Sequence, residues 1–372
     1  MTATAQPKLR VGVVGANGHP ERWGARVHVP VFQALPEVEL KAVCTAHEET
    51  AQAAARRFGV DRAYSDYRRL VEDPDIDLVS VAVRVPDHHP ICMAALAAGK
   101  HVLCEWPLAL NAAHAQEMEK AASARALYGT VDLQSRFSPG VLLLRELLAR
   151  RFVGDLVTFN MVHFVPNYIR PVAPHRAWIA RADSGGGALT IQTGHATDVL
   201  QWCLGERIAA VLGHTRTARR EWDLAGGDER VPVTSPDNVA FVARMDSGAV
   251  GSVQVSVTAW HGGGWRLEVY GAEGKLAASC PGMLMWTPVR VSGATKGDTR
   301  EAEFRPGDSH VFVHEFKEED VPFNVAQLVR TLVRSMRNGA PFAPGFSEAV
   351  HLHRTLEAVQ RSSTTGGWVS VS

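Results

Sequence analysis

Apolar and polar positions in the first part of the chain alternate between short β-branched runs and stretches with helical spacing. The compact apolar runs predict buried strands, at Arg10–Val14, Val38–Cys44, Ile76–Val83, His101–Cys104 and Tyr128–Leu133. Helical stretches separate them, at Val29–Leu35, Glu48–Phe58, Pro90–Ala98 and Ala112–Ala124. Strands that alternate with helices of this length predict an α/β, Rossmann-like, doubly wound parallel sheet, which binds nucleotides at the carboxyl ends of its strands.

The pattern changes after about residue 150, where strands follow one another with short loops. We predict strands at Leu156–Val165, Ala209–Thr217, Asn238–Met245, Val250–Val257, Arg266–Tyr270 and Lys275–Ala278. Turns at Asp246–Gly248 and Gly271–Gly274 favour antiparallel hairpins. The polar segment Ala218–Thr234 is interpreted as a loop, and Val325–Asn338 and Ser347–Ser362 as late helices.

These patterns predict two domains. Residues 1–135 form the nucleotide-binding domain, and residues 136–372 form an α/β substrate and dimerisation domain with a large, open, mostly antiparallel sheet. We expect the final helices to pack back on the first domain. An uncovered apolar sheet face is commonly used for association, so we also expect a homo-oligomer, a dimer or a tetramer, through the second sheet.

Composition narrows the functional class. The 39 basic and 39 acidic side chains balance, which argues against a nucleic-acid or membrane-surface protein but allows a small anionic ligand. The five cysteines are widely spaced and form no Cys-x-x-Cys pair, so we expect reduced, buried thiols. Residues Met1–Lys8 are polar and lack the apolar stretch of a secretion signal. We therefore expect a cytoplasmic protein.

The first chemical signal is the turn Gly15-Ala16-Asn17-Gly18, which follows a strand and precedes a helix. Glycines in this place let the backbone approach a pyrophosphate, and the helix N-terminus supplies N–H donors. Asn17 stands where the second glycine of the usual fingerprint would be, and the helix resumes only around Trp23. A plain strand-to-helix turn therefore remains an alternative.

The end of the second strand bears on the choice of cofactor. An NAD-preferring site places Asp or Glu there to bind the ribose hydroxyls, whereas this chain has Thr45 followed by His47. Both side chains can donate to a 2′-phosphate, so we favour NADP slightly over NAD. The alternative is that Thr45 only ends the strand and that either cofactor binds.

Two later motifs carry a specific resemblance. The run Gly99–Leu108 includes Glu105-Trp106-Pro107, and Gly185–Leu189 is followed by Gly194-His195 and Asp198. Together with the pattern of the first domain, they resemble the Gfo/Idh/MocA family of oxidoreductases. The likeness is greatest to the branch that contains the fungal galactose-pathway repressor, on Asn17 with Trp23, Glu105-Trp106, Leu133–Arg136 with Ser138-Pro139, and Thr193–His195 with Thr197-Asp198.

The resemblance implies a Rossmann domain, a mixed-sheet substrate domain, a nicotinamide cofactor and a proline that often follows a cis bond. It implies a structural or nicotinamide-side role for Glu105, and Trp106 can stack on a flat ligand or simply pack. The cofactor contacts that we expect are Gly15, Asn17, Trp23, Thr45, His47, Val83, Arg84, His88, Glu105, Trp106 and Gln134.

Two departures from the family pattern affect catalysis. The family's usual Glu-Lys-Pro has a lysine that shuttles a proton, and here that position is Trp106, whose indole N–H only donates. The usual aspartate four residues before the motif histidine is Ile191. Of the three expected catalytic groups only His195 survives.

His195 is therefore our first candidate for general acid/base catalysis, because histidine ordinarily titrates near neutral pH. Asp198 lies three residues on and is expected to orient the imidazole. Tyr168 is a second candidate donor, in the segment Val165–Arg176 that we expect to cover the site, with His163 and His175 as weaker ones. The alternatives are a structural histidine for His195 and a surface aromatic for Tyr168.

We predict no metal site, since the neighbouring His88 and His89 diverge on a helix and His195 with Asp198 offers only two ligands. The favoured function is a NAD(P)-dependent oxidoreductase that acts on a small-molecule sugar, polyol or related carbonyl compound. The alternatives are a non-catalytic dinucleotide-binding regulator and an NAD-using lyase or hydrolase.

Overall fold

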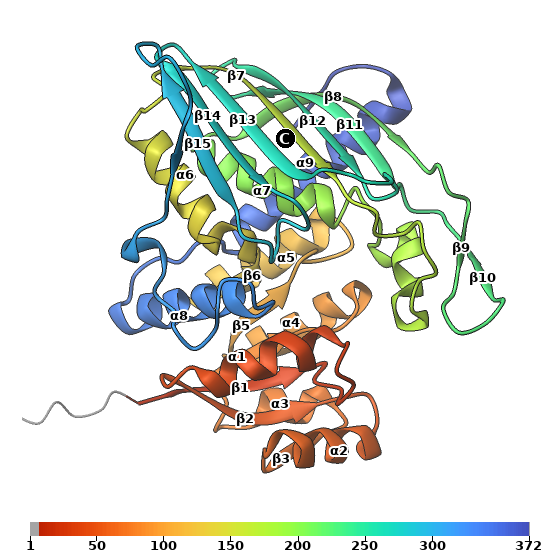
Figure 1. Cartoon of the computed structure of the whole chain (residues 1–372). Coiled ribbons are helices and arrows are strands. Elements are labelled where there is room, and N and C mark those ends of the chain that lie inside the picture. Colours follow the sequence, from red (N-terminus) through yellow and green to blue (C-terminus); the bar gives the residue numbers. More distant parts are fainter. Residues whose placement is uncertain (1–6, 372) are drawn as a thin grey trace, which may run out of the picture. The chain divides into compact units, whose positions relative to one another are not determined.

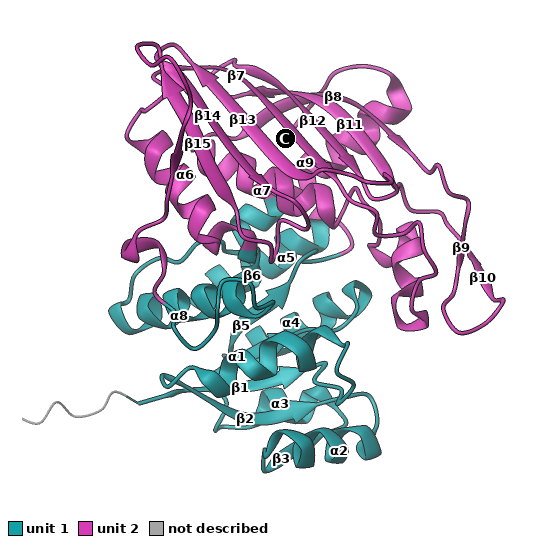
Figure 2. Cartoon of the chain, viewed as in Figure 1, with its two compact units in different colours: residues 1–109, 113–134, 313–350 teal, residues 110–112, 135–312, 351–372 magenta. Residues whose placement is uncertain are grey.

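The computed structural model describes residues 7–371, so most of the polar segment Met1–Lys8 lies outside the described part. The chain divides into two compact units, coloured separately in Figure 2. The first unit comprises residues 1–109, 113–134 and 313–350, and the second comprises residues 110–112, 135–312 and 351–372. Within residues 7–371, no helix combines the length and the apolar character that a bilayer crossing requires.

The first unit contains a parallel sheet of six strands in the order β3-β2-β1-β4-β5-β6. Its strands are β1 Leu9–Val14, β2 Val38–Cys44, β3 Arg62–Tyr64, β4 Leu78–Val81, β5 His101–Glu105 and β6 Gly129–Asp132. The predicted doubly wound sheet is thus confirmed. The edge strand β3 escaped prediction because three residues are too few to show a period.

Helices of the first unit connect these strands (Figure 1). They are α1 Val29–Ala34, α2 Glu48–Phe58, α3 Tyr67–Glu72, α4 His88–Ala97 and α5 Ala112–Ser123. The late helix α8 Phe323–Asn338 also belongs to this unit and contacts α1. A wider π turn at Gly24–His28 precedes α1. Pro30, near the start of α1, has no backbone N–H and cannot donate an α-helical hydrogen bond to the preceding turn. The hydrogen-bond pattern therefore differs there.

The second unit is built on a sheet of nine strands in the order β16-β15-β14-β13-β7-β12-β11-β8-β17. The strands are β7 Leu156–Phe164, β8 Ile208–Arg216, β11 Asn238–Met245, β12 Val250–Ser256, β13 Gly264–Gly271, β14 Gly274–Cys280, β15 Arg290–Thr295, β16 Ala302–Phe304 and β17 Val369–Ser370. Only β12 and β7 run parallel; the other neighbours are antiparallel. The predicted mostly antiparallel sheet is confirmed.

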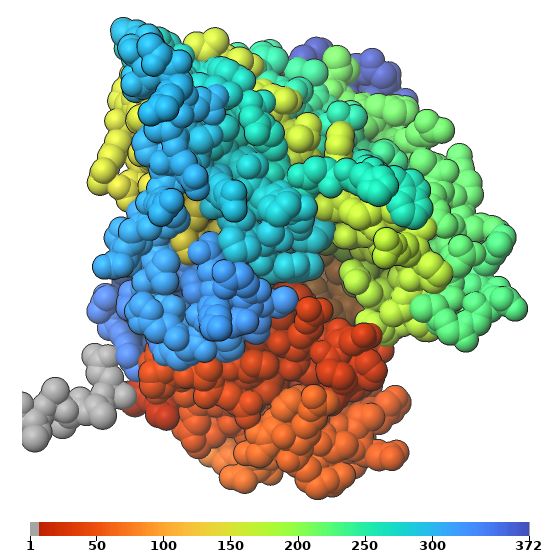
Figure 3. All heavy atoms as spheres, viewed as in Figure 1, coloured from red at the N-terminus to blue at the C-terminus, as the bar shows by residue number. Residues whose placement is uncertain are grey.

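One face of this sheet carries helices and the other is open. The helices are α6 Pro139–Ala149, α7 Gln192–Leu204 and the second-unit part of α9 Phe346–Thr365. Along β12 exposed and buried positions alternate, and Val250 on the open face is 43% exposed. In the space-filling view, atoms of these strands, in green to cyan, lie at the surface (Figure 3).

The segment Ala218–Thr234 differs from its prediction. It contains two short paired strands, β9 Glu221–Asp223 and β10 Arg230–Pro232, instead of a loop. The polar composition of this segment predicted a loop. Trp222 is nevertheless 1% exposed, and this large buried side chain holds the hairpin in place.

Candidate active site

The turn after β1 has the geometry that a dinucleotide site requires. Gly15 has φ +100°, and its N–H donates to the carbonyl of Cys44 at 2.9 Å. A Cβ on Gly15 would lie 2.3 Å from the carbonyl oxygen of Ala82 and 3.0 Å from Val83 Cγ1. Only glycine fits this turn, which leaves its backbone open to a ligand. The structure thus brings together Gly15 and Val83, two of the predicted contacts.

Gly24 is a site residue that the sequence reasoning missed. A Cβ there would lie 2.7 Å from the carbonyl oxygen of Gly15, so the helix start and the strand end can approach only because Gly24 has no side chain. This is the close-packing role of the last glycine in a dinucleotide fingerprint. The usual spacing from Gly15 did not find it, because the intervening loop is longer than the fingerprint allows.

Positive charge gathers beside this loop. Arg57 donates to the carbonyl of Gly18. Burial, and then the charge of the nearby Arg84, lower the pKa of Arg22 below its usual value. Asn17 Oδ1 accepts a hydrogen bond from the N–H of His19 at 3.1 Å and so shapes the loop. Guanidinium groups next to backbone N–H donors are suited to a pyrophosphate.

The end of β2 is neutral, as its sequence indicated. Thr45 Oγ1 donates to the carbonyl of His47 at 3.0 Å and lies 2.6 Å from Thr50 Oγ1. The hydroxyl of Thr45 is therefore already engaged within its own loop. His47 itself is exposed, directly before α2.

The turn after β5 carries the Glu-Trp-Pro motif, and the bond between Trp106 and Pro107 is cis, as the resemblance implied. Glu105 Oε1 accepts a hydrogen bond from Trp23 Nε1 at 2.8 Å, which links this turn to the start of the first helix. Trp106 is 5% exposed, so most of its ring packs against protein. The predicted contact Gln134 begins a 3₁₀ turn, where its Oε1 is buried without a hydrogen-bond partner among the described residues.

His88 has a different place from the one predicted. It is 1% exposed, and its Nδ1 and Nε2 lie 2.9 Å from the carbonyl of Pro107 and 3.2 Å from that of Val83. Burial lowers its pKa. His88 therefore joins two loops of the expected cofactor site and presents no unengaged nitrogen to a cofactor.

His195 lies on α7 in the second unit and is 4% exposed. Burial, with a smaller effect from His163, lowers its pKa to about 3. The prediction that it titrates near pH 7 is wrong for this environment, because a buried imidazole loses the solvation that its charged form needs. Its Nδ1 has no hydrogen-bond partner among the described residues, so the neutral ring retains an unused donor or acceptor.

Asp198 is engaged with Arg136 instead of orienting His195. Its two carboxylate oxygens accept from Arg136 Nε at 2.8 Å and Nη2 at 2.5 Å, and both side chains are buried. The forked guanidinium matches a carboxylate with two bonds, which a single imidazole N–H cannot. The expectation drawn from the i, i+3 spacing is therefore wrong about the partner.

Tyr168 is buried instead of standing on an exposed loop. It is 1% exposed, and its ring stacks on Trp222 of β9 with centroids 4.4 Å apart and planes 15° apart. Arg219 also donates to its backbone carbonyl. The hairpin β9–β10 thus covers the segment that follows β7.

Several buried polar side chains around α7 have no hydrogen-bond partner among residues 7–371. We call them the α7 polar cluster: Ser135, Ser138, His163, Gln192, Thr193, His195 and Thr197, counting only Nδ1 for His195. Gln192 to Thr197 lie on α7 itself, and Ser135 and Ser138 flank the Arg136 that binds α7. Burying polar groups unpaired is costly, so hydroxyl-rich ligands or water molecules suit this cluster. The sequence analysis ranked His163 low and quoted Thr193 and Thr197 only for the family resemblance, not as site residues.

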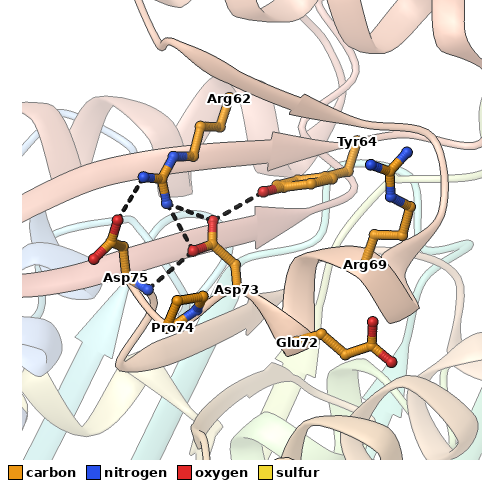
Figure 4. A pocket seen from close by; sticks show the side chains of 7 residues that line it. All are labelled: Arg62, Tyr64, Arg69, Glu72, Asp73, Pro74 and Asp75. Atoms are coloured by element: carbon orange, nitrogen blue, oxygen red, sulfur yellow. Dashed lines mark hydrogen bonds and ion pairs between the residues drawn. The ribbon is translucent and has the colours of Figure 1, made fainter.

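A pocket on the edge of the first sheet has a structural explanation (Figure 4). Arg62 binds both oxygens of Asp73 at 2.7 Å and also pairs with Asp75, while the hydroxyl of Tyr64 donates to Asp73 at 2.9 Å. The charges of Arg62, Asp73 and Asp75 therefore satisfy one another, and Arg69 and Glu72 complete the lining.

Comparison with known proteins agrees with this geometry. Residues 9–132 match the model of an oxidoreductase family with an NAD-binding Rossmann fold, and residues 141–277 match the GFO/IDH/MocA C-terminal domain. The levoglucosan dehydrogenase of Pseudarthrobacter phenanthrenivorans is 30% identical over 72% of this chain and 73% of that protein. The chain belongs to the Gfo/Idh/MocA family. The predicted fold class and enzyme class, an NAD-binding oxidoreductase, are thereby confirmed.

Two further matches within the Gfo/Idh/MocA family cover nearly the whole chain. The galactose/lactose metabolism regulatory protein GAL80 of Saccharomyces cerevisiae is 24% identical over 98% of this chain and 94% of that protein. A levoglucosan dehydrogenase solved with NADH and L-sorbose superposes with a TM-score of 0.85 at 24% identity, covering 99% of this chain and 100% of that one. The predicted resemblance to the repressor's branch thus has a counterpart among the relatives.

Proposed function

We propose that this protein is a nicotinamide-dependent dehydrogenase that interconverts a hydroxyl and a carbonyl group of a sugar or polyol. The proposal rests on the tight turn at Gly15 and the close approach of Gly24 to it, which together we call the cradle. A Cβ at either position would fill this space. Gly15, Val83, Arg84 and Trp23 would hold the dinucleotide, which supplies hydride transfer when bound.

The α7 polar cluster supports a polyhydroxylated substrate. Its hydroxyl, amide and imidazole groups are buried and lack partners among the described residues, and a sugar brings many donors and acceptors at once. The relatives agree, since one is a levoglucosan dehydrogenase and a solved levoglucosan dehydrogenase holds L-sorbose.

We assign the reacting hydroxyl to His195. Its neutral imidazole can accept the hydroxyl hydrogen during oxidation and return it during reduction. Trp106 cannot take part in this proton transfer, because its indole N–H only donates. We propose that Trp106 instead positions the nicotinamide ring of the dinucleotide. Because burial holds the pKa of His195 near 3, the proton must pass onward to other groups as it arrives.

For the cofactor we propose NADP ahead of NAD. The end of β2 bears Thr45 and His47 and no carboxylate, so nothing there repels a 2′-phosphate. Arg57 adds positive charge at the Gly15–Gly18 loop. The engaged hydroxyl of Thr45 leaves His47 as the better donor of the two.

Calorimetry with NAD+, NADH, NADP+ and NADPH tests the cradle directly. Turnover is then followed at 340 nm with a panel of aldoses, ketoses, anhydrosugars and cyclic polyols. Binding of a pyridine nucleotide together with sugar-dependent absorbance change is expected. Absence of affinity for all four dinucleotides would reject the proposal.

A regulatory role is the second candidate, and two positions favour it. Trp106 and Ile191 replace residues with which the family usually handles protons, and GAL80, a regulatory protein by name, matches almost the full length of the chain. Dinucleotide binding without turnover on the whole panel, together with a protein partner whose affinity changes with the dinucleotide, would establish this role.

We further propose that the protein acts in the cytoplasm as a homo-oligomer joined through the open face of the second sheet. Val250 on that face is exposed, and the five cysteines are free and buried, as in a reducing compartment. Light scattering on the purified protein measures the assembly, and Val250→Lys is expected to shift it towards the monomer.

A further inference from the structure

Three ionisable side chains meet inside the first unit, beneath the turn that carries Trp106. His28 Nε2 lies 2.5 Å from Glu105 Oε1 and 3.5 Å from Asp132 Oδ2. His28 Nδ1 lies 2.7 Å from the hydroxyl of Ser80. The side chains of His28 and Asp132 are 0% exposed and that of Glu105 is 15% exposed. We call His28, Glu105 and Asp132 the buried triad.

The spacing of the buried triad fits a shared proton better than a metal ion. Two ligand atoms bound to one zinc ion, each about 2.0–2.2 Å from it, stand roughly 3.3 Å apart in a tetrahedral site. The 2.5 Å separation between His28 and Glu105 is the length of a strong hydrogen bond. His28 and Glu105 are therefore joined by a hydrogen bond, and the Asp132 carboxyl lies beside them.

Charge balance requires one more proton. Glu105 and Asp132 are neighbouring carboxyl groups in a buried site, and two carboxylates in contact cannot both remain ionised there. Asp132 has no hydrogen-bond partner for either oxygen among the described residues, although its neighbour could supply a proton. Besides the triad, the titratable groups that interact here are the thiols of Cys104 and Cys92.

The buried triad is linked to two residues of the proposed dinucleotide site, Trp23 and Trp106. Glu105 accepts a hydrogen bond from Trp23, at the start of the helix that follows the Gly15 turn. Glu105 also directly precedes Trp106 and the cis bond. The protonation state of Glu105 therefore affects both Trp23 and Trp106.

We propose that Glu105 and Asp132 share one proton, with neutral His28 as the third partner, and that this proton sets dinucleotide affinity by holding Trp23 and Trp106 in place. The inference rests on the proposed function. His28 and Asp132 act in it as positioning residues, since they reach the cofactor site only through Glu105. Loss of the proton leaves two repelling carboxylates and loosens both attachments.

The electrostatics of the site agree with this assignment. Burial raises the pKa of Glu105 to about 7, against a partial lowering by its hydrogen bonds. Burial and the Glu105 carboxylate raise the pKa of Asp132 well above its usual range, and burial lowers that of His28. The two carboxyl groups titrate as a pair, so the first proton leaves with an apparent value that belongs to both.

The test is the pH dependence of dinucleotide affinity, measured by calorimetry with NADH, or NADPH if only that form binds. For the wild type, Kd is expected to rise between pH 6 and 9, by at most about tenfold per pH unit, because one proton is linked to binding. Repeating the titration in buffers of different ionisation enthalpy should show proton uptake on binding at the alkaline end.

Two substitutions and a matched control decide the assignment. Glu105→Gln imitates the protonated side chain and Asp132→Asn removes the repelling charge, so each should flatten the pH dependence to less than about twofold. Glu117→Gln removes another carboxylate that pairs with a histidine, His89 at 2.8 Å, but one that is 58% exposed. It should keep the wild-type slope, which also contains any titration of the ligand itself.

A wild-type affinity that does not change with pH would overturn the proposal, as would an unchanged slope in Glu105→Gln. Infrared spectroscopy supplies a readout that needs no dinucleotide. A protonated carboxyl band is expected in the wild type and should disappear in Glu105→Gln and Asp132→Asn but persist in Glu117→Gln. If the band changes as expected but no dinucleotide binds, the proposed function fails and the shared proton still holds. If the wild type shows no protonated carboxyl band, the shared proton is rejected.

Discussion

The buried polar groups of the two units are satisfied in different ways. In the first unit Glu105 and His28 bond to each other, and His88 bonds to backbone carbonyls. In the second unit the α7 polar cluster, His163 and His195 included, is buried without partners among the described residues. The dinucleotide side is thus built from backbone shape supported mostly by completed bonds, with Asp132 and Gln134 Oε1 as exceptions among the described residues. The substrate side is built from side chains whose hydrogen bonds a ligand can complete.

The largest expected effect concerns His195, on the substrate side of this comparison. His195→Ala should lower kcat by about 10²–10⁴-fold, as loss of a general acid/base does, while dinucleotide affinity stays within about twofold. Steady-state kinetics and calorimetry on the same preparation check both numbers. His214→Ala, a histidine elsewhere in the second unit, is the control. Unchanged turnover in His195→Ala would remove the residue from the mechanism.

Gly15 tests the dinucleotide side, in the first unit. Gly15→Ala places a Cβ 2.3 Å from the carbonyl oxygen of Ala82 and forces a residue with φ +100°. We expect dinucleotide affinity to fall by about 10²-fold or more, in line with a strained backbone and a filled cradle. Gly59→Ala has a positive φ of +63° but no atom within 4 Å of the new Cβ, so it should cost stability and spare affinity. Equal affinity in both variants would contradict the cradle.

The pair Arg136–Asp198 sharpens the contrast inside the second unit, because it is buried and satisfied beside an unsatisfied cluster. Arg136→Met leaves a buried carboxylate alone and should reduce the free energy of unfolding by about 3–5 kcal/mol. Denaturant titration measures the change. Arg151→Met removes an exposed partner of Asp155 and should change stability little. A small effect at Arg136 would mean that the carboxylate finds another partner.

The smallest expected effect concerns the choice of cofactor. Thr45→Asp introduces a carboxylate at the end of β2, which should repel a 2′-phosphate and shift the ratio of NADP to NAD affinity by roughly tenfold towards NAD. Competition binding with the two oxidised forms reports the ratio. Thr45→Val removes the hydroxyl without adding charge and should leave the ratio in place. No shift in Thr45→Asp means that this strand end does not contact the ribose.

Much of the first unit could be predicted from the sequence because its signals are local. The strand β1, the Gly15 turn and helix α2 depend on residues adjacent in the chain, and α2 was predicted with its observed bounds. Apolar periodicity also predicted β11 as observed. The resemblance on the Glu-Trp-Pro motif supplied the family, which periodicity alone does not determine.

The sequence by itself determined the alternation of strands and helices, the glycine turn and the loss of the usual lysine at Trp106. Only the tertiary structure decided which groups meet, because the partners lie far apart in the chain. Glu105 and His28 are separated by 77 positions, and Asp198 and Arg136 by 62. The low pKa of His195 likewise follows from burial that the whole unit creates. A local pattern fixes which side of a helix or strand is apolar, whereas packing fixes what each polar atom faces.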